Sequence, residues 1–126
     1  MTNILNKYKI KFVTSDQFAI YNRISSVDPL MSQFIGDHYV VPRAARILEG
    51  LRNVLDDKIQ SYEPYTQSLQ QMVAKKLMTD FYDDYRDYDD DNNIQPGYSI
   101  TTSDLIIIVQ AWHDYLENSP LKNPGY

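Results

Sequence analysis

The sequence predicts a mainly α-helical single domain over residues 1–126, a helical bundle with a short N-terminal β-strand or β-ribbon. Apolar residues recur every three or four positions along three long segments, as in helices that bury one face. The 126 residues are 43% hydrophobic, which is enough for one packed core. Only residues 7–13 show a clear alternation of polar and apolar residues, the period of two that is typical of a strand. An α+β fold is the alternative.

The N-terminal strand is predicted over residues 7–13. Its two faces are Lys7, Lys9 and Lys11 on one side and Tyr8, Ile10 and Phe12 on the other. A lone strand leaves backbone groups unpaired, so residues 39–41 or 98–100 are the candidate partners. Ser15 and Asp16 then predict the start of a short helix through Ile24, and Pro29 predicts another.

Two long helices are predicted in the middle of the chain. The first covers residues 42–62, because Pro42 suits a first helical turn and Pro64 stops the pattern. Its apolar stripe is Ala44, Ile47, Leu48, Leu51, Val54, Leu55 and Ile59. The second covers residues 65–88, where apolar side chains recur every four residues at Leu69, Val73, Leu77 and Phe81.

The last main helix is predicted over residues 102–117. Thr101 with Asp104 three residues later resembles a capping box. The stripe that follows is Leu105, Ile108, Val109, Trp112 and Leu116. Residues 89–100 form an acidic loop by composition, and residues 119–126 form an irregular tail.

Charge is concentrated in residues 80–93. Seven of the 17 acidic residues lie there beside one arginine, which gives this segment a charge of −6 in a chain of net charge −5. On the predicted helix, Asp80, Asp83, Asp84 and Asp87 share one face. Like charges four residues apart, near a helix C-terminus, oppose stability. A charge arrangement that destabilises its own helix, with no visible compensation elsewhere in the sequence, indicates that these residues have a function.

These residues predict a surface that binds a basic partner protein, a toxin or a nucleic-acid-binding enzyme. Carboxylates would steer association and pair with lysine or arginine, while tyrosines anchor the contact. The predicted partner-binding residues are Asp80, Tyr82, Asp83, Asp84, Tyr85, Asp87, Tyr88, Asp89, Asp90 and Asp91. The function predicted is non-catalytic inhibition of that partner. The competing interpretation is a solvated acidic segment that only adds solubility.

Catalysis, cofactors and metals are not predicted. The chain has no cysteine and no His-Glu-x-x-His motif, and His38 and His113 are its only histidines. Asp87, Asp89 and Asp91 match the first positions of a calcium loop, but Asn92 and Tyr98 stand where glycine and glutamate are needed. The negative net charge also opposes direct binding of nucleic acid.

A cytoplasmic protein without a membrane partner is expected. No signal-peptide pattern opens the chain, and the longest apolar run, residues 105–109, is far too short to span a bilayer. An alternative function is a small assembly protein that self-associates through Ile106 and Ile107, which point away from the core stripe of the last helix, Ile107 almost opposite it. This alternative leaves a homodimer open.

The acidic tyrosine-rich segment, followed by a helix with Ile108 and Trp112 and by Pro124-Gly125-Tyr126, resembles the surface of colicin-type immunity proteins. The resemblance covers about a third of the chain and is one of surface type. It implies a helical protein that neutralises a nuclease toxin through acidic residues and neighbouring tyrosines. Phage-encoded inhibitors of defence nucleases, which mimic nucleic acid, follow the same physical logic.

Overall fold

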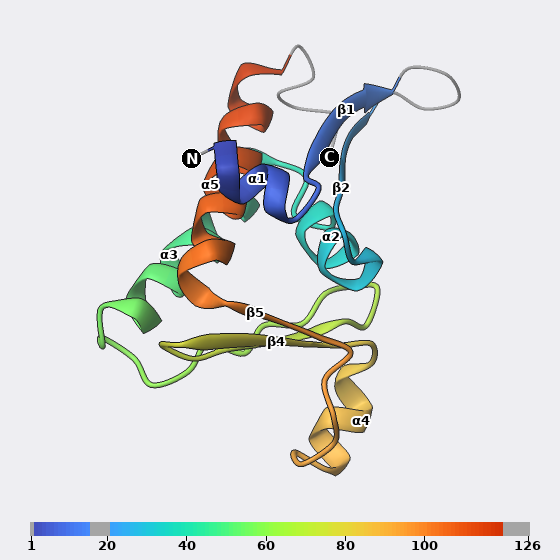
Figure 1. The fold of residues 1–126 in the computed structure, drawn as a ribbon. Helices are drawn as coiled ribbons and strands as arrows, with labels where there is room; N and C mark the ends of the chain where they lie inside the picture. The colour runs from blue at the N-terminus through green and yellow to red at the C-terminus, as the bar shows by residue number, and fades with distance from the viewer. Residues whose placement is uncertain (1, 16–20, 120–126) are drawn as a thin grey trace.

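The computed structural model describes residues 2–15 and 21–119. Within these ranges the fold is α+β, with one two-stranded and one three-stranded antiparallel sheet (Figure 1). The prediction of a mainly helical bundle is therefore wrong. The elements are α1 (Thr2–Lys7), β1 (Lys11–Ser15), β2 (Tyr21–Ser25), α2 (Pro29–Gly36), α3 (Val41–Leu55), β3 (Gln71–Ala74), β4 (Met78–Tyr82), α4 (Tyr85–Asp90), β5 (Tyr98–Thr101) and α5 (Thr102–Asn118).

The N-terminal strand starts at Lys11, later than predicted, because a helix precedes it. The alternating pattern breaks at Lys9, whose φ of 55° is incompatible with a strand. Tyr8 is only 9% exposed, and its hydroxyl donates to Asp104 of α5 at 2.6 Å. Burial, followed by the bond to Asp104, raises the pKa of Tyr8 to about 12. The docking of Tyr8 onto α5 thus outweighs the local pattern.

The strand partner of β1 is β2, in a register that places Phe12 opposite Ile24. Residues 39–41 and 98–100 were the predicted partners, so both alternatives are wrong. The helix expected through Ile24 is also wrong, because Tyr21–Ser25 is a strand in which Asn22 and Ile24 are buried. Its predicted start, Asp16, lies outside the described residues.

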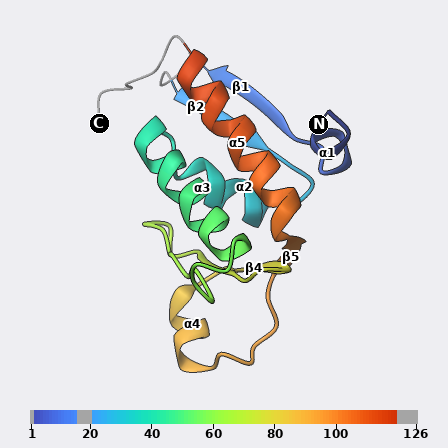
Figure 2. The same ribbon diagram turned by 90° about the vertical axis from the view of Figure 1, so that its left-hand side faces the viewer.

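The helical core is formed mainly by α3 and α5, which pack side by side with α2 behind them (Figure 2). Trp112 of α5 is fully buried and donates a hydrogen bond from Nε1 to the carbonyl oxygen of His38 at 2.9 Å. The bounds of α5 differ by one residue from the predicted 102–117. Ile106 and Ile107 are both half-buried, and Ile106 packs against the core.

The helix predicted over residues 42–62 ends early, at Leu55. Asp57 adopts a left-handed φ of 62°, which reverses the chain direction. Tyr62 then returns to α3 and lies against Gly50, where an added Cβ would stand 2.4 Å from the Tyr62 ring. Gly50 therefore provides the space that lets this segment pack back on its own helix.

The helix predicted over residues 65–88 is wrong, because β3 and β4 form an antiparallel hairpin within it, with Met72 opposite Phe81, and only its last residues are helical, in α4. The apolar residues spaced four apart do not share one face of this hairpin, because Val73 lies opposite Asp80. Leu77 lies at the hairpin turn and is 78% exposed, whereas Phe81 is fully buried. The pattern alone could not separate these alternatives.

The predicted acidic loop over residues 89–100 is shorter, because α4 continues to Asp90 and β5 begins at Tyr98. The strand β5 completes the sheet beside β4 and leads directly into α5. Of the predicted tail, residues 120–126 lie outside the described part of the chain. No helix in the described ranges combines the length and apolar character needed to cross a bilayer.

Candidate functional site

The most acidic part of the structure is a projection, here called the acidic arm, which comprises residues 83–93. Its six aspartates and one arginine give it a charge of −5. It contains α4 and the turn after it, and it extends from the three-stranded sheet on the side away from α3 and α5 (Figures 1 and 2). The prediction that Asp83, Asp84 and Asp87 share one face of a long helix is wrong, because α4 begins only at Tyr85.

Three of the predicted carboxylates have partners within the chain. Asp80 belongs to β4 and accepts a hydrogen bond from the Ser99 hydroxyl at 2.6 Å. Asp84 caps α4 by accepting from the backbone N–H of Arg86 at 2.9 Å, and it also pairs with the Arg86 guanidinium. The side-chain hydrogen bond from Arg86 lowers the pKa of Asp84 to about 2. Asp91 accepts from the backbone of Asn93.

The other four predicted carboxylates have no partner among the described residues and can contact another molecule. Asp83, Asp87, Asp89 and Asp90 are all exposed. None of them has a side-chain hydrogen bond or salt bridge to another described residue. The arm therefore presents four unengaged negative charges on a short segment.

Two of the predicted tyrosine anchors hold the arm to the body of the protein. Tyr82 is 6% exposed, and its ring centroid lies 4.7 Å from that of Tyr88. The Tyr88 hydroxyl reaches Glu63 at 3.4 Å, and burial raises the pKa of both tyrosines. Tyr82 is therefore covered while the sheet is intact, and it positions the arm.

The third predicted tyrosine stacks on a residue that sequence reasoning missed. Tyr85 lies over Tyr65 with ring centroids 4.3 Å apart and an interplanar angle of 18°. Tyr65 is 60% exposed, so this pair forms an aromatic surface at the base of the arm. This pair could not be predicted from the sequence, because the predicted helix over residues 65–88 placed Tyr65 and Tyr85 far apart.

Tyr65 also lines a pocket of about 340 Å³. Here called the arginine pocket, it is lined by charged and aromatic side chains, among them Asp37, His38, Tyr39, Arg43, Arg46, Tyr62 and Tyr65. Arg43 and Arg46 come from the first turns of α3, and Tyr62 and Tyr65 come from the segment that packs back on it. Neither arginine was among the partner-binding residues predicted from the sequence.

His38 is held in a fixed orientation in this pocket. Its Nδ1 lies 2.8 Å from the carbonyl oxygen of Phe34, so Nδ1 carries the proton and Nε2 is left as an acceptor. Burial lowers the pKa of His38 below its usual value of 6.5. The imidazole is therefore neutral at pH 7 and can accept a hydrogen bond.

Asp37 beside it is in an unfavourable position. Its Oδ2 is buried and has no hydrogen-bond partner among the described residues. Asp37 is also the C-cap of α2, where the helix dipole disfavours an anion. A carboxylate in this position costs stability, as is common where a residue is retained for binding.

Replacement of Asp37 with asparagine is expected to raise the free energy of unfolding by about 1 kcal/mol, because the buried charge is removed. Urea denaturation followed by circular dichroism would measure it. Asp56→Asn is the matched control, because Asp56 is an exposed C-cap of α3 and should gain less. A lower urea midpoint for Asp37→Asn would show instead that its charge stabilises the fold.

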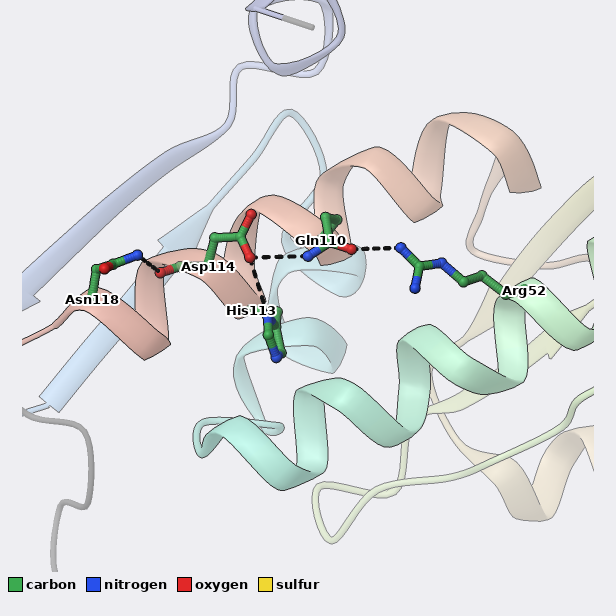
Figure 3. A network of polar contacts seen from close by, with 5 residues as sticks. All are labelled: Arg52, Gln110, His113, Asp114 and Asn118. Atoms are coloured by element: carbon green, nitrogen blue, oxygen red, sulfur yellow. Dashed lines mark hydrogen bonds and ion pairs between the residues drawn. The ribbon is translucent and has the colours of Figure 1, made fainter.

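The described residues contain one further cluster of metal-ligand types, His113, Asp114 and Glu117, whose ligand atoms lie within 4.8 Å of one another. Asp114 already accepts a hydrogen bond from Gln110 and contacts His113, in a chain of contacts that reaches Arg52 (Figure 3). None of these three side chains has a buried nitrogen or oxygen atom that lacks a hydrogen-bond partner, so we assign no metal to this cluster. The calcium-loop alternative also fails, because Tyr85–Asp90 is helical.

Neither protein-family models, curated proteins nor solved structures gave a match to this chain.

Proposed function

We propose that this protein is a non-catalytic inhibitor that binds a basic, nucleic-acid-handling partner protein through its acidic arm. The observation that carries the proposal is the group of four unengaged carboxylates on a projection fixed to the sheet by aromatic contacts. Charges fixed in advance lose little conformational freedom on binding, and they steer a basic partner toward the site. The partner-facing residues are Asp83, Asp87, Asp89 and Asp90, with Tyr85 at the base of the arm.

The arm is poorly explained by stability alone. A helix of six residues is too short to form in isolation, and α4 carries aspartates near its C-terminus, where the dipole opposes them. The Asp84–Arg86 pair is exposed and contributes little. The conformation of the arm therefore depends on its contacts with the sheet and with Glu63. This is consistent with a segment whose role is to present a binding surface.

The kind of partner follows from charge. A protein that binds nucleic acid carries lysine and arginine at the phosphate positions, and carboxylates can occupy those positions in place of phosphates. Immunity toward a nuclease toxin is the first form of this proposal, and an anti-defence inhibitor that mimics nucleic acid is the second. A cytoplasmic location belongs to the same proposal, because a chain without cysteine suits a reducing compartment.

The triple variant Asp87→Asn, Asp89→Asn and Asp90→Asn tests the proposal. It is expected to retain its thermal stability, because the three side chains are exposed, while partner binding at low salt weakens by about tenfold or more. The measurement is capture of proteins from the source lysate at low and high salt. The captured protein is then purified, and its nucleic-acid binding is titrated with wild type and variant.

The control variant is Glu49→Gln, Asp56→Asn and Glu117→Gln. It changes the net charge by the same amount at exposed positions on α3 and α5, away from the arm. The control should bind like wild type. Equal weakening in both variants would mean that net charge alone acts, and unchanged binding in the arm variant would exclude the arm as the interface.

A further inference from the structure

We propose that the arginine pocket binds a small organic phosphate that carries a planar ring, of which a mononucleotide is the best fit. The proposal is independent of the partner protein, because it concerns a separate cavity whose lining residues lie between positions 37 and 68, outside the acidic arm. It is carried by three features of that cavity, which are its unpaired arginines, its aromatic walls and its fixed neutral histidine.

The arginines provide the phosphate site. Arg43 and Arg46 are three residues apart on α3, so their side chains leave the same face of the helix. Neither has a carboxylate within salt-bridge distance among the described residues. Two guanidinium groups offer two charges and paired N–H donors, which match a phosphate dianion better than a carboxylate monoanion.

The aromatic walls provide the ring site. Tyr39, Tyr62 and Tyr65 line the cavity, and the Arg43 guanidinium lies 5.4 Å from the centre of the Tyr39 ring. Aromatic faces and an arginine plane are the surfaces on which nucleobases stack. A cavity of about 340 Å³ is within the size range of small-molecule sites.

The histidine favours a nucleobase over a simple aryl group. With Nδ1 bonded to Phe34, the Nε2 of His38 is left to accept a hydrogen bond from a ligand N–H. Nucleobases have such donors and a phenyl ring has none. Asp37 also lines the cavity, and its one negative charge against the two arginines leaves the pocket with a net charge of +1.

Isothermal titration calorimetry with AMP, GMP, phenyl phosphate and inorganic phosphate tests this inference, and amide NMR spectra locate the binding. Wild type is expected to bind at least one ring phosphate with Kd below about 1 mM, and Arg46→Gln should weaken that binding about tenfold or more. The amide signals that shift should be those of residues around His38, Tyr39 and Arg46. Tighter binding of AMP or GMP than of phenyl phosphate identifies a nucleotide as the source, and equal binding identifies an aryl phosphate.

Arg52→Gln is the matched control, because Arg52 is exposed on the same helix and points to Gln110 instead of the pocket. It should bind like wild type. Arg43→Gln provides a second pocket variant if Arg46→Gln lowers the melting temperature. The inference is overturned by the absence of saturable binding up to about 10 mM ligand. It is also overturned if both pocket variants bind the ligand as tightly as wild type, or if the amide shifts are confined to other surfaces. None of these results bears on the acidic arm.

Discussion

Replacement of Trp112 with alanine is expected to lower the free energy of unfolding by about 3–5 kcal/mol, the largest effect of any single substitution considered. Trp112 is fully buried, and its ring lies 5.8 Å from that of Phe12 and 6.1 Å from that of Tyr115. The substitution also removes the hydrogen bond to the backbone of His38. It should therefore loosen α5, the N-terminal ribbon and the arginine pocket together. Urea denaturation with a folded-state probe other than tryptophan would measure the loss.

Trp112→Phe separates packing from hydrogen bonding. It keeps an aromatic ring at the centre of the core but leaves the His38 carbonyl without its donor, so a smaller loss is expected, about 1–3 kcal/mol. A loss below about 1 kcal/mol for the alanine variant would contradict the central position of Trp112.

Replacement of Gly50 with alanine is expected to destabilise the protein by about 1–3 kcal/mol, although alanine is the better helix former by about 1 kcal/mol. The added methyl carbon would stand 2.4 Å from Cε2 of Tyr62, a distance that no packed structure tolerates. Tyr62 cannot move away freely, because its backbone exchanges two hydrogen bonds with the backbone of Ala74 in an isolated β-bridge.

A double-mutant cycle with Tyr62→Ala tests this explanation. In the Tyr62→Ala background the clash is absent, so Gly50→Ala should now be neutral or stabilising, with its sign reversed. Chemical denaturation of the four proteins gives the coupling free energy. Equal destabilisation in both backgrounds would mean that Gly50 is needed for another reason.

The sequence predicted the parts of this fold whose contacts are regular and local. The segments that form α3 and α5 have long stripes of apolar residues that line up on one face only in a helix. Most of the ends of these two helices were therefore predicted to within a few residues. The end of α3 was the exception, because the left-handed conformation of Asp57 has no strong sequence signal.

The missed elements depend on distant contacts or on ambiguous patterns. Leu69, Val73, Leu77 and Phe81 recur every four positions as on a helix, yet only Val73 and Phe81 lie in strands, one in β3 and one in β4. Tyr8 leaves its alternating pattern because of a hydrogen bond to a residue that follows it by 96 positions. Tertiary contacts of this range cannot be read from a window of neighbouring residues.

The candidate site was predicted in composition but not in geometry. The concentration of charge was evident from residues 80–93, because counting requires no structure. The hydrogen bonds that each carboxylate makes depend on where the hairpin ends and α4 begins. Because of these boundaries, Asp80 bonds to Ser99 and Asp84 caps α4, so both have structural roles. The arginine pocket joins α3 to the segment after it, so it became visible only in three dimensions.

The dependence of the N-terminal elements on α5 has a consequence during protein synthesis. Tyr8 bonds to Asp104, Thr14 to Tyr115 and Asn22 to Ser119, so the first quarter of the chain rests on a helix made near its end. A ribosome makes about 5–20 residues per second, so these segments wait for seconds before their partner exists. During that time the ribbon and the rings of Phe12 and Tyr8 have no core to join. A nascent chain of this protein is therefore expected to bind chaperones until α5 emerges, and to gain protease resistance in a single late step.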